Sequence, residues 1–296
     1  MAAFRDIARR INSVKNTHKT TRAMEMVAAA RLRRAQARIE ALRPYAERMI
    51  ELTHEVAKHT EGGEQFPLLK VHEEEKRVGI VMLTGDRGLA GAFNANILRR
   101  AIELHDRIRA EGKEVAWIVI GKKGVGTMRF RGYELTDSVQ GITDRPKYTD
   151  AEAIAHQIVK FYEAGGLDRV YLVYNHFKSP MEQVVTEQVI LPLGEEVVTT
   201  EPEAEGEHRI EGDFIYEPSA NAILHELLPS YVDTTIYRAL LESTASEHGA
   251  RMTAMRSASE NAEEMIEKLT LSMNKARQAS ITQEILEVVA GAEALG

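Results

Sequence analysis

The sequence predicts an α/β domain joined to two long terminal helices that pair as an antiparallel coiled coil. Each end of the chain is a long run of helix-forming residues whose apolar stripe is too narrow to form a core alone. Between the ends, short apolar runs alternate with helical ones, which is typical of βαβ units in a mostly parallel, Rossmann-like sheet. Because the chain returns to its start through this middle region, the terminal helices are expected to run in opposite directions.

The amino-terminal helix is expected over residues 1–60. Met1 to Arg43 contains no Gly or Pro and is rich in Ala, Arg, Met and Gln. Apolar and small residues follow a heptad repeat with a polar middle, which fades toward His59. The seam positions are Ile7, Ile11, Val14, His18, Thr21, Glu25, Ala28, Leu32, Ala35, Ile39 and Leu42.

The α/β domain is expected over residues 75–195. The expected strands are Val78–Leu83, Val115–Ile120, Val170–Tyr174 and Gln183–Leu191, and the expected helices are Asn94–Arg109 and Asp150–Ala164. Five Gly residues between Gly121 and Gly141 indicate a variable connection. Residues 196–218 are expected as an exposed acidic loop, because Glu195–Gly212 is acidic and nearly devoid of aromatic residues.

The carboxy-terminal helix is expected over residues 219–296, with Pro229 as a bend or an interruption. At about 1.5 Å per residue it is on the order of 80–100 Å long, too long for a compact domain to enclose. We interpret the polar breaks at His18, Glu25 and His248 as positions that face partners. The seam positions of this helix are Leu241, Ala245, His248, Met252, Met255, Ser259, Ala262, Ile266, Leu269, Met273, Ala276 and Ser280.

The composition of the 296 residues excludes several functions. With no cysteine, the chain has no disulfide, thiolate metal site or thiol nucleophile. No apolar stretch is long enough to span a membrane, so direct membrane insertion is not expected. Residues 1–50 carry 12 Lys and Arg against 4 Asp and Glu, whereas the rest carries 26 against 41. This basic arm predicts an acidic partner, namely nucleic acid, anionic lipid or an acidic protein surface, or else a solvated helix face.

No catalytic motif emerges from the sequence. The segment GDRGLAGAFN, Gly85–Asn94, follows a strand and precedes a helix, where glycines either cradle a phosphate or shape a tight turn. We favour the turn, because the Walker and G-x-G-x-x-G patterns are both absent. His54 and His59 are five residues apart, which places them on different helix faces and argues against zinc. The basic arm lacks interleaved aromatic residues, so nucleic-acid binding is not expected.

Four separated segments resemble the F-type ATP synthase γ subunit family of bacteria. They are MEMVAAARLRRAQ at Met24–Gln36, GDRGLAGAFN, ARMTAMRSASENA at Ala250–Ala262 and ITQEILEVVAGAEA at Ile281–Ala294. The resemblance implies a non-catalytic rotor shaft whose helix pair turns inside a hexamer of α and β subunits, with the α/β domain as a foot. It also implies an ε subunit, a ring of membrane c subunits, no cofactor or metal, and a peripheral place at the cytoplasmic face of the cell membrane.

The resemblance further implies contact residues. Arg251, Gln278, Thr282 and Glu284 match positions that meet an acidic catch loop of β, and Met24 matches a position near that contact. Ile285, Leu286, Val288 and Val289 match the shaft tip in an apolar collar, or else they complete the coiled coil. Ala90 replaces a common cysteine, and the cysteine pair of photosynthetic relatives is absent. The alternatives are a basic coiled-coil adaptor, a nucleic-acid-binding protein and a small α/β enzyme.

Overall fold

The computed structural model of the chain describes residues 2–58, 60, 66–72, 74–194, 217 and 219–293. The acidic loop expected at residues 196–218 lies outside this part of the chain, apart from Glu217. The chain divides into two compact units, Met1–Ala29 with Arg251–Gly296, and Ala30–Ala250. Each unit contains a stretch of both terminal helices.

A five-stranded sheet organises the second unit, with strand order β3-β2-β1-β4-β5 among the described residues. Its strands are β1 (Arg77–Leu83), β2 (Glu114–Ile120), β3 (Asp137–Val139), β4 (Arg169–Phe177) and β5 (Gln183–Leu191). β3, β2, β1 and β4 are parallel, whereas β5 pairs antiparallel with β4. A short turn closed by backbone hydrogen bonds between Ser179 and Glu182 joins β4 to β5, and such a connection permits only antiparallel pairing.

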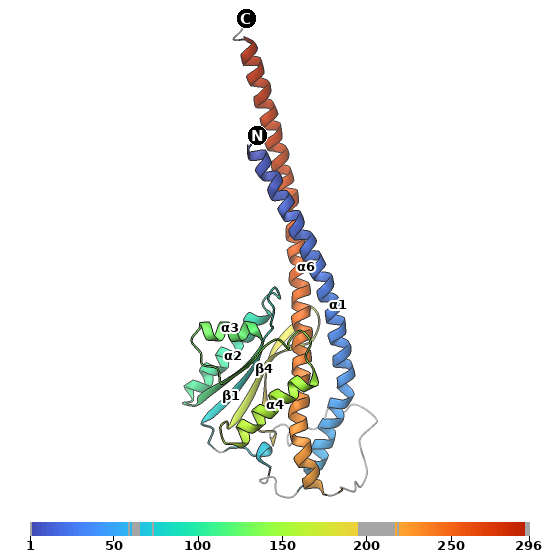
Figure 1. Cartoon of the computed structure of the whole chain (residues 1–296), viewed down its shortest axis with the longest axis vertical. Helices are drawn as coiled ribbons and strands as arrows, with labels where there is room; N and C mark the ends of the chain where they lie inside the picture. The colour runs from blue at the N-terminus through green and yellow to red at the C-terminus, as the bar shows by residue number, and fades with distance from the viewer. Residues whose placement is uncertain are drawn as a thin grey trace. The chain divides into compact units, whose positions relative to one another are not determined.

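Helices cover both faces of this sheet (Figure 1). On one face Ile80, Met82 and Val119 pack with α2 (Phe93–Ala110) and α3 (Lys122–Phe130). On the other face the alternate strand residues pack with α4 (Tyr148–Glu163) and with the terminal helices. The short helix η2 (Pro67–Leu69) also contributes to this second cluster. The mostly parallel sheet with helices on both faces is confirmed.

The segment between Gly121 and Gly141 is not merely a variable connection, because it contains α3 and β3. Gly124 lies inside α3, where a Cβ atom would stand 2.6 Å from Thr84 Oγ1. Its backbone N–H donates to that same hydroxyl at 2.9 Å. This glycine therefore permits close packing of a helix on the end of β1, although glycine in sequence more often indicates a turn.

The terminal helices are α1 (Ala2–Lys58) and α6 (Ala220–Glu293), and both continue through a proline. Pro229 does not interrupt α6, contrary to one expectation. An interior proline costs a helix about 3 kcal/mol. The buried neighbours Leu224, Leu228 and Val232 hold this part of α6 against the core and offset that cost.

The heptad pattern read from the sequence matches the observed burial. Every seam position named above in α1 and α6 is buried or half-buried. Within the second unit, the stretch of α6 from Tyr231 to Gly249 contains no exposed residue, so it is a core helix and not a helix with one apolar face.

Candidate partner-contact surface

In the first unit, α1 and α6 pair in antiparallel register. Thr21 Oγ1 and Ser259 Oγ share a buried hydrogen bond of 2.7 Å. One turn along, Arg256 Nε donates to Glu25 Oε1 at 2.9 Å. These two pairs replace apolar knobs at the polar middle of the seam and fix its register.

Two of the three polar seam residues have partners inside the chain. Glu25 is paired with Arg256 across the two helices and stays partly exposed, so whether it also faces a partner stays a prediction. His248 in the second unit is buried, with its side chain 2% exposed, so the expectation that it faces a partner is wrong. His18 is half-buried and lines a groove between the two helices. This groove carries both signs of charge and is lined by His18, Arg22, Glu25, Met26, Ala29, Met252, Arg256, Ser259, Glu260 and Glu263.

The five residues matched to the β catch contact fall into two separate places. Met24 is 39% exposed, and the observed register puts it within about two helical turns of the half-buried Arg251. Gln278, Thr282 and Glu284 are exposed near the end of α6. Because 27 residues separate Arg251 from Gln278, they lie roughly 40 Å apart along the helix.

Two local hydrogen bonds order the second group. Thr282 Oγ1 donates to the carbonyl oxygen of Gln278 at 3.0 Å, and Ser280 Oγ lies 3.3 Å from Glu284 Oε1. Gln278 and Thr282 are one turn apart on one face, whereas Glu284 is six residues from Gln278 and faces another direction. The three side chains can thus meet a partner that surrounds the helix.

The four tip residues are exposed within the described chain. The exposed fractions of Ile285, Leu286, Val288 and Val289 are 57%, 63%, 72% and 50%. Extending the register of the helix pair puts Ala2 level with about residue 278, so the tip extends past the first described residue of α1. Within the described chain, α1 therefore leaves these four side chains uncovered.

Sequence reasoning missed three further apolar residues on the same helix. Met265, Leu271 and Ile281 are 48%, 64% and 47% exposed. They lie outside the seam, and periodicity alone assigns such positions to a solvated face. A count of large apolar residues at non-seam positions would have found them, because solvated coiled-coil faces are normally polar.

The glycine-rich turn at Gly85–Asn94 is occupied by its own carboxylate. Asp86 Oδ1 accepts hydrogen bonds from the backbone N–H of Lys122, at the start of α3, and of Gly141, both at 2.9 Å. Burial alone would raise the pKa of Asp86, but these bonds and those from Thr143 outweigh it and hold the pKa below its usual value. Asp86 thus ties the turn to the start of α3, and Asn94 Oδ1 accepts from the Gly85 N–H at 2.8 Å across the turn itself, so the polar groups of the turn are paired within the chain.

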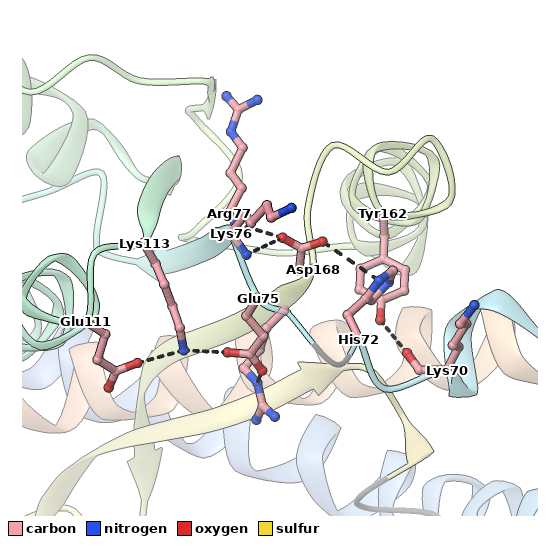
Figure 2. Close-up of polar contacts among 10 residues, drawn as sticks. Lys70, His72, Glu75, Lys76, Arg77, Glu111, Lys113, Tyr162 and Asp168 are labelled. Carbon is pink, nitrogen blue, oxygen red and sulfur yellow. Dashed lines mark hydrogen bonds and ion pairs between the residues drawn. The ribbon is translucent and has the colours of Figure 1, made fainter.

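A second charged cluster lies at the other end of the strands, where β1, β2 and β4 begin (Figure 2). Asp168 accepts from the backbone N–H groups of Lys76 and Arg77 at 2.7 and 2.8 Å. Glu75 pairs with Lys113 and Arg169. Burial alone would raise the pKa of Glu75, but these two partners outweigh it and hold the pKa below its usual value. The carboxylates are engaged by neighbours in the chain, so the cluster anchors the segment before β1.

No group of three or more His, Asp or Glu side chains is arranged to hold a metal ion in the part of the chain that the structure describes. Among the helices in that same part, none is both long and apolar enough to cross a membrane.

The family of the chain follows from its similarity to known proteins. The ATP synthase family model matches residues 3–295. The ATP synthase gamma chain of Moorella thermoacetica is 47% identical over the full length of both chains. That of Rubrobacter xylanophilus is 45% identical, covering 100% of this chain and 99% of the relative. The chain belongs to the ATP synthase γ family.

Solved structures agree with the γ family assignment. The central stalk and c-ring structure of Tetrahymena thermophila mitochondrial ATP synthase contains a chain 28% identical, with a TM-score of 0.60, covering 81% of this chain and 99% of that one. The rotor of Euglena gracilis mitochondrial ATP synthase, 19% identical, gives a TM-score of 0.66 over 95% and 99% of the chains and supports the fold. As a γ chain, the protein is a non-catalytic central-stalk subunit of a membrane-associated complex.

Proposed function

We propose that the helix pair is the shaft that carries rotation from a membrane ring of c subunits to the catalytic β subunits. The shaft would stand in a ring of three α and three β subunits, with ATP made in β. Residues 75–195 would form the foot beside the c-ring and an ε subunit. Residues 1–60 and 219–296 would supply the two helices.

The observation that carries this proposal is the far end of α6. From Ile281 to Ala292 every residue is exposed, although the stretch is rich in Ile, Leu and Val. A helix end that exposes apolar side chains all round is suited to burial by a surrounding partner. Apolar contact is non-directional, so such a tip can turn without breaking hydrogen bonds.

The two groups of contact residues suggest two levels of engagement with β. Arg251 and Met24 would form one level, and Gln278, Thr282 and Glu284 the other, nearer the tip. An arginine fork binds a carboxylate through two parallel hydrogen bonds only in a narrow range of orientations. Such a contact would hold the shaft at one angle and release it at the next, which shifts β among its open and closed states.

The location follows from the same assembly. A relative's central stalk is joined to a c-ring in the Tetrahymena thermophila complex. By analogy the foot would bind the ring at the cytoplasmic face of a bacterial cell membrane as a peripheral subunit. Proton flow through the ring would then drive rotation.

The experiment is reconstitution of the full chain with matched α and β subunits. We expect a stable complex with one γ chain per three α and three β, ATP hydrolysis that depends on the complex, and rotation of a probe attached to the foot. Failure of the folded chain to join the hexamer would overturn the proposal. Salt-sensitive binding of nucleic acid by the chain alone would instead favour the adaptor alternative.

A charge reversal tests the catch. Arg251→Glu should lower ATP synthesis by the complete complex by about tenfold, because it places a carboxylate against the proposed acidic loop. The matched control is Arg129→Glu, which reverses an exposed arginine on α3 of the foot. Unchanged synthesis in the Arg251 variant, with normal assembly of both variants, would remove Arg251 from the catch.

A further inference from the structure

We propose that Asp144 is the positioning residue of a rigid polar joint that fixes the α/β domain to both terminal helices for the transmission of torque. This inference rests on the shaft function proposed above. It concerns the second unit alone, where the loop between β3 and α4 meets α1 and α6.

One carboxylate oxygen of Asp144 lies between the two helices, bonded to one and close to the other. Arg31 Nη1 of α1 donates a hydrogen bond to Asp144 Oδ1. His248 Nε2 of α6 lies 3.9 Å from the same oxygen, and the His248 side chain is 2% exposed. The side chains of Arg31 and Asp144 are 28% and 29% exposed, so the ion pair is partly shielded from water.

The loop that carries Asp144 is itself tied to the sheet. Thr143 donates to Asp86 Oδ2 through its N–H at 3.0 Å and through its hydroxyl at 2.9 Å. The carbonyl oxygen of Thr143 accepts from Thr244 Oγ1 of α6 at 2.9 Å. Nearby, Arg38 Nη1 of α1 donates to the carbonyl oxygen of Pro146 at 3.3 Å. Force on the sheet therefore has a hydrogen-bonded path through Asp86 and this loop to each helix.

The joint lies where both helices leave the second unit. Arg31 is the second residue of that unit on α1, and His248 is third from its last residue on α6. Arg31, Asp144 and His248 all belong to the second unit, so the joint ties this end of each helix to the α/β domain within one unit. Hydrogen bonds are directional, so they resist the sliding and turning that apolar packing permits.

The packing of α6 changes character toward the joint. From Leu224 to Leu240 its buried contacts with the core are largely apolar. Further along, the buried residues Glu242, Ser243, Thr244, Ser246, Glu247 and His248 are polar. Burying so many polar groups costs free energy unless they are specifically paired, and their value lies in a unique register.

The joint also accounts for the first glycine of the GDRG motif. A Cβ atom on Gly85 would lie 2.7 to 2.9 Å from the carboxylate atoms of Glu247. Gly85 therefore lets α6 approach the turn closely, and the Gly85 N–H donates to Asn94 Oδ1 at 2.8 Å. The first glycine of the motif thus allows α6 to pack closely against the turn, and this role involves no phosphate.

The test compares one variant in two settings: proton pumping against a gradient, where the shaft turns under load, and soluble ATP hydrolysis, where it turns without load. Asp144→Asn would be assembled into the complete complex in liposomes and, separately, into the soluble complex with α and β. We expect soluble ATP hydrolysis within about twofold of the unmodified protein, because the shaft still turns freely. Proton pumping per ATP should fall severalfold as the opposing proton gradient rises. Hydrogen exchange of the 141–147 amides should be about tenfold faster, as expected for loss of a charge-assisted hydrogen bond.

A second pair of variants keeps the test decisive if Asp144→Asn does not assemble. Arg31→Lys, which retains a charge for Asp144, should restore most of the coupling that Arg31→Ala loses. The exposed Arg33→Ala, two residues along α1, is the matched control and should couple normally.

Each other outcome counts against the joint. Normal pumping at every gradient in Asp144→Asn or Arg31→Ala would overturn it, as would a loss of soluble hydrolysis equal to the loss of pumping. An equal loss of hydrolysis and pumping indicates a general structural defect. Failure of the unmodified chain to assemble would refute the shaft function itself, which distinguishes the two proposals.

Discussion

Two stretches of the same helix have opposite surroundings. From Tyr231 to Gly249, α6 has no exposed residue, and from Ile281 to Ala292 it has no buried one. The first stretch holds many polar side chains, including Asp233, Glu242 and His248. The second exposes Ile281, Leu286 and Val288. Polarity is thus inverted relative to the usual rule for a folded chain.

The difference separates two kinds of burial. The polar residues of the first stretch are held by the chain itself, as with His176 Nδ1 and Glu242 Oε2, which lie 2.6 Å apart. The apolar residues of the second have no such cover among the described residues. The first stretch should therefore control the stability of the free chain, and the second should control assembly.

The largest expected effect on the stability of the free chain comes from shortening one buried side chain in the first stretch. Ile236, which is 0% exposed, packs in the cluster between the sheet and the helices. Ile236→Ala should lower the free energy of unfolding of the free chain by about 2–5 kcal/mol, through lost apolar burial and a cavity. Urea unfolding measures it. A cost below about 0.5 kcal/mol would show that this stretch is not a core helix.

A smaller effect is expected at the carboxylate that organises the joint loop. Asp86→Asn should cost about 1.5–3 kcal/mol at neutral pH, because the amide nitrogen cannot accept hydrogen bonds from N–H groups. The folded pKa of Asp86 is lowered, so its stabilisation is full above the unfolded value near pH 4 and is lost as pH falls through the folded pKa.

The pH dependence checks that assignment. The stability difference between the unmodified chain and Asp86→Asn should be constant above about pH 5 and shrink in acid. Asp106→Asn, whose side chain is 70% exposed, is the control and should show little difference at any pH. A difference that is the same at pH 7 and pH 3 would contradict the charged role of Asp86.

The smallest effect on the free chain is expected at the tip. Ile285→Ala changes the same residue type on the same helix as Ile236→Ala, but its side chain is 57% exposed. It should change the free energy of unfolding by less than about 0.5 kcal/mol. The same variant should weaken assembly with the hexamer, measured by binding of the labelled chain. A large loss of stability in the free chain would reverse the comparison.

The seam and the main helices and strands could be predicted because local periodicity encodes them. Leu32 and Ala35 on α1, and Ala245 and Ser259 on α6, are buried where the heptad pattern places them. The helix ends of α2 and α4 fell within two residues of the expected bounds. In these elements the hydrophobic pattern and the tertiary contacts agree.

Tertiary contacts decided what local pattern could not. Gly124 belonged to an expected variable connection but lies in α3, because the close approach to Thr84 is invisible in sequence. His248 suggested a partner contact but lies near Asp144, more than 100 positions away in the chain. Of the contact surface, the tip was named from family resemblance, whereas its exposure all round is seen in the structure alone.

Hydrogen exchange along α6, in the free chain and in the complex with α and β, tests the central claim most directly. The amides of 231–249 should exchange slowly in both states, because the chain itself buries them. The amides of 281–292 should exchange fast in the free chain and become strongly protected on assembly. Equal protection of 281–292 in both states, or protection gained at 231–249 instead, would contradict the account.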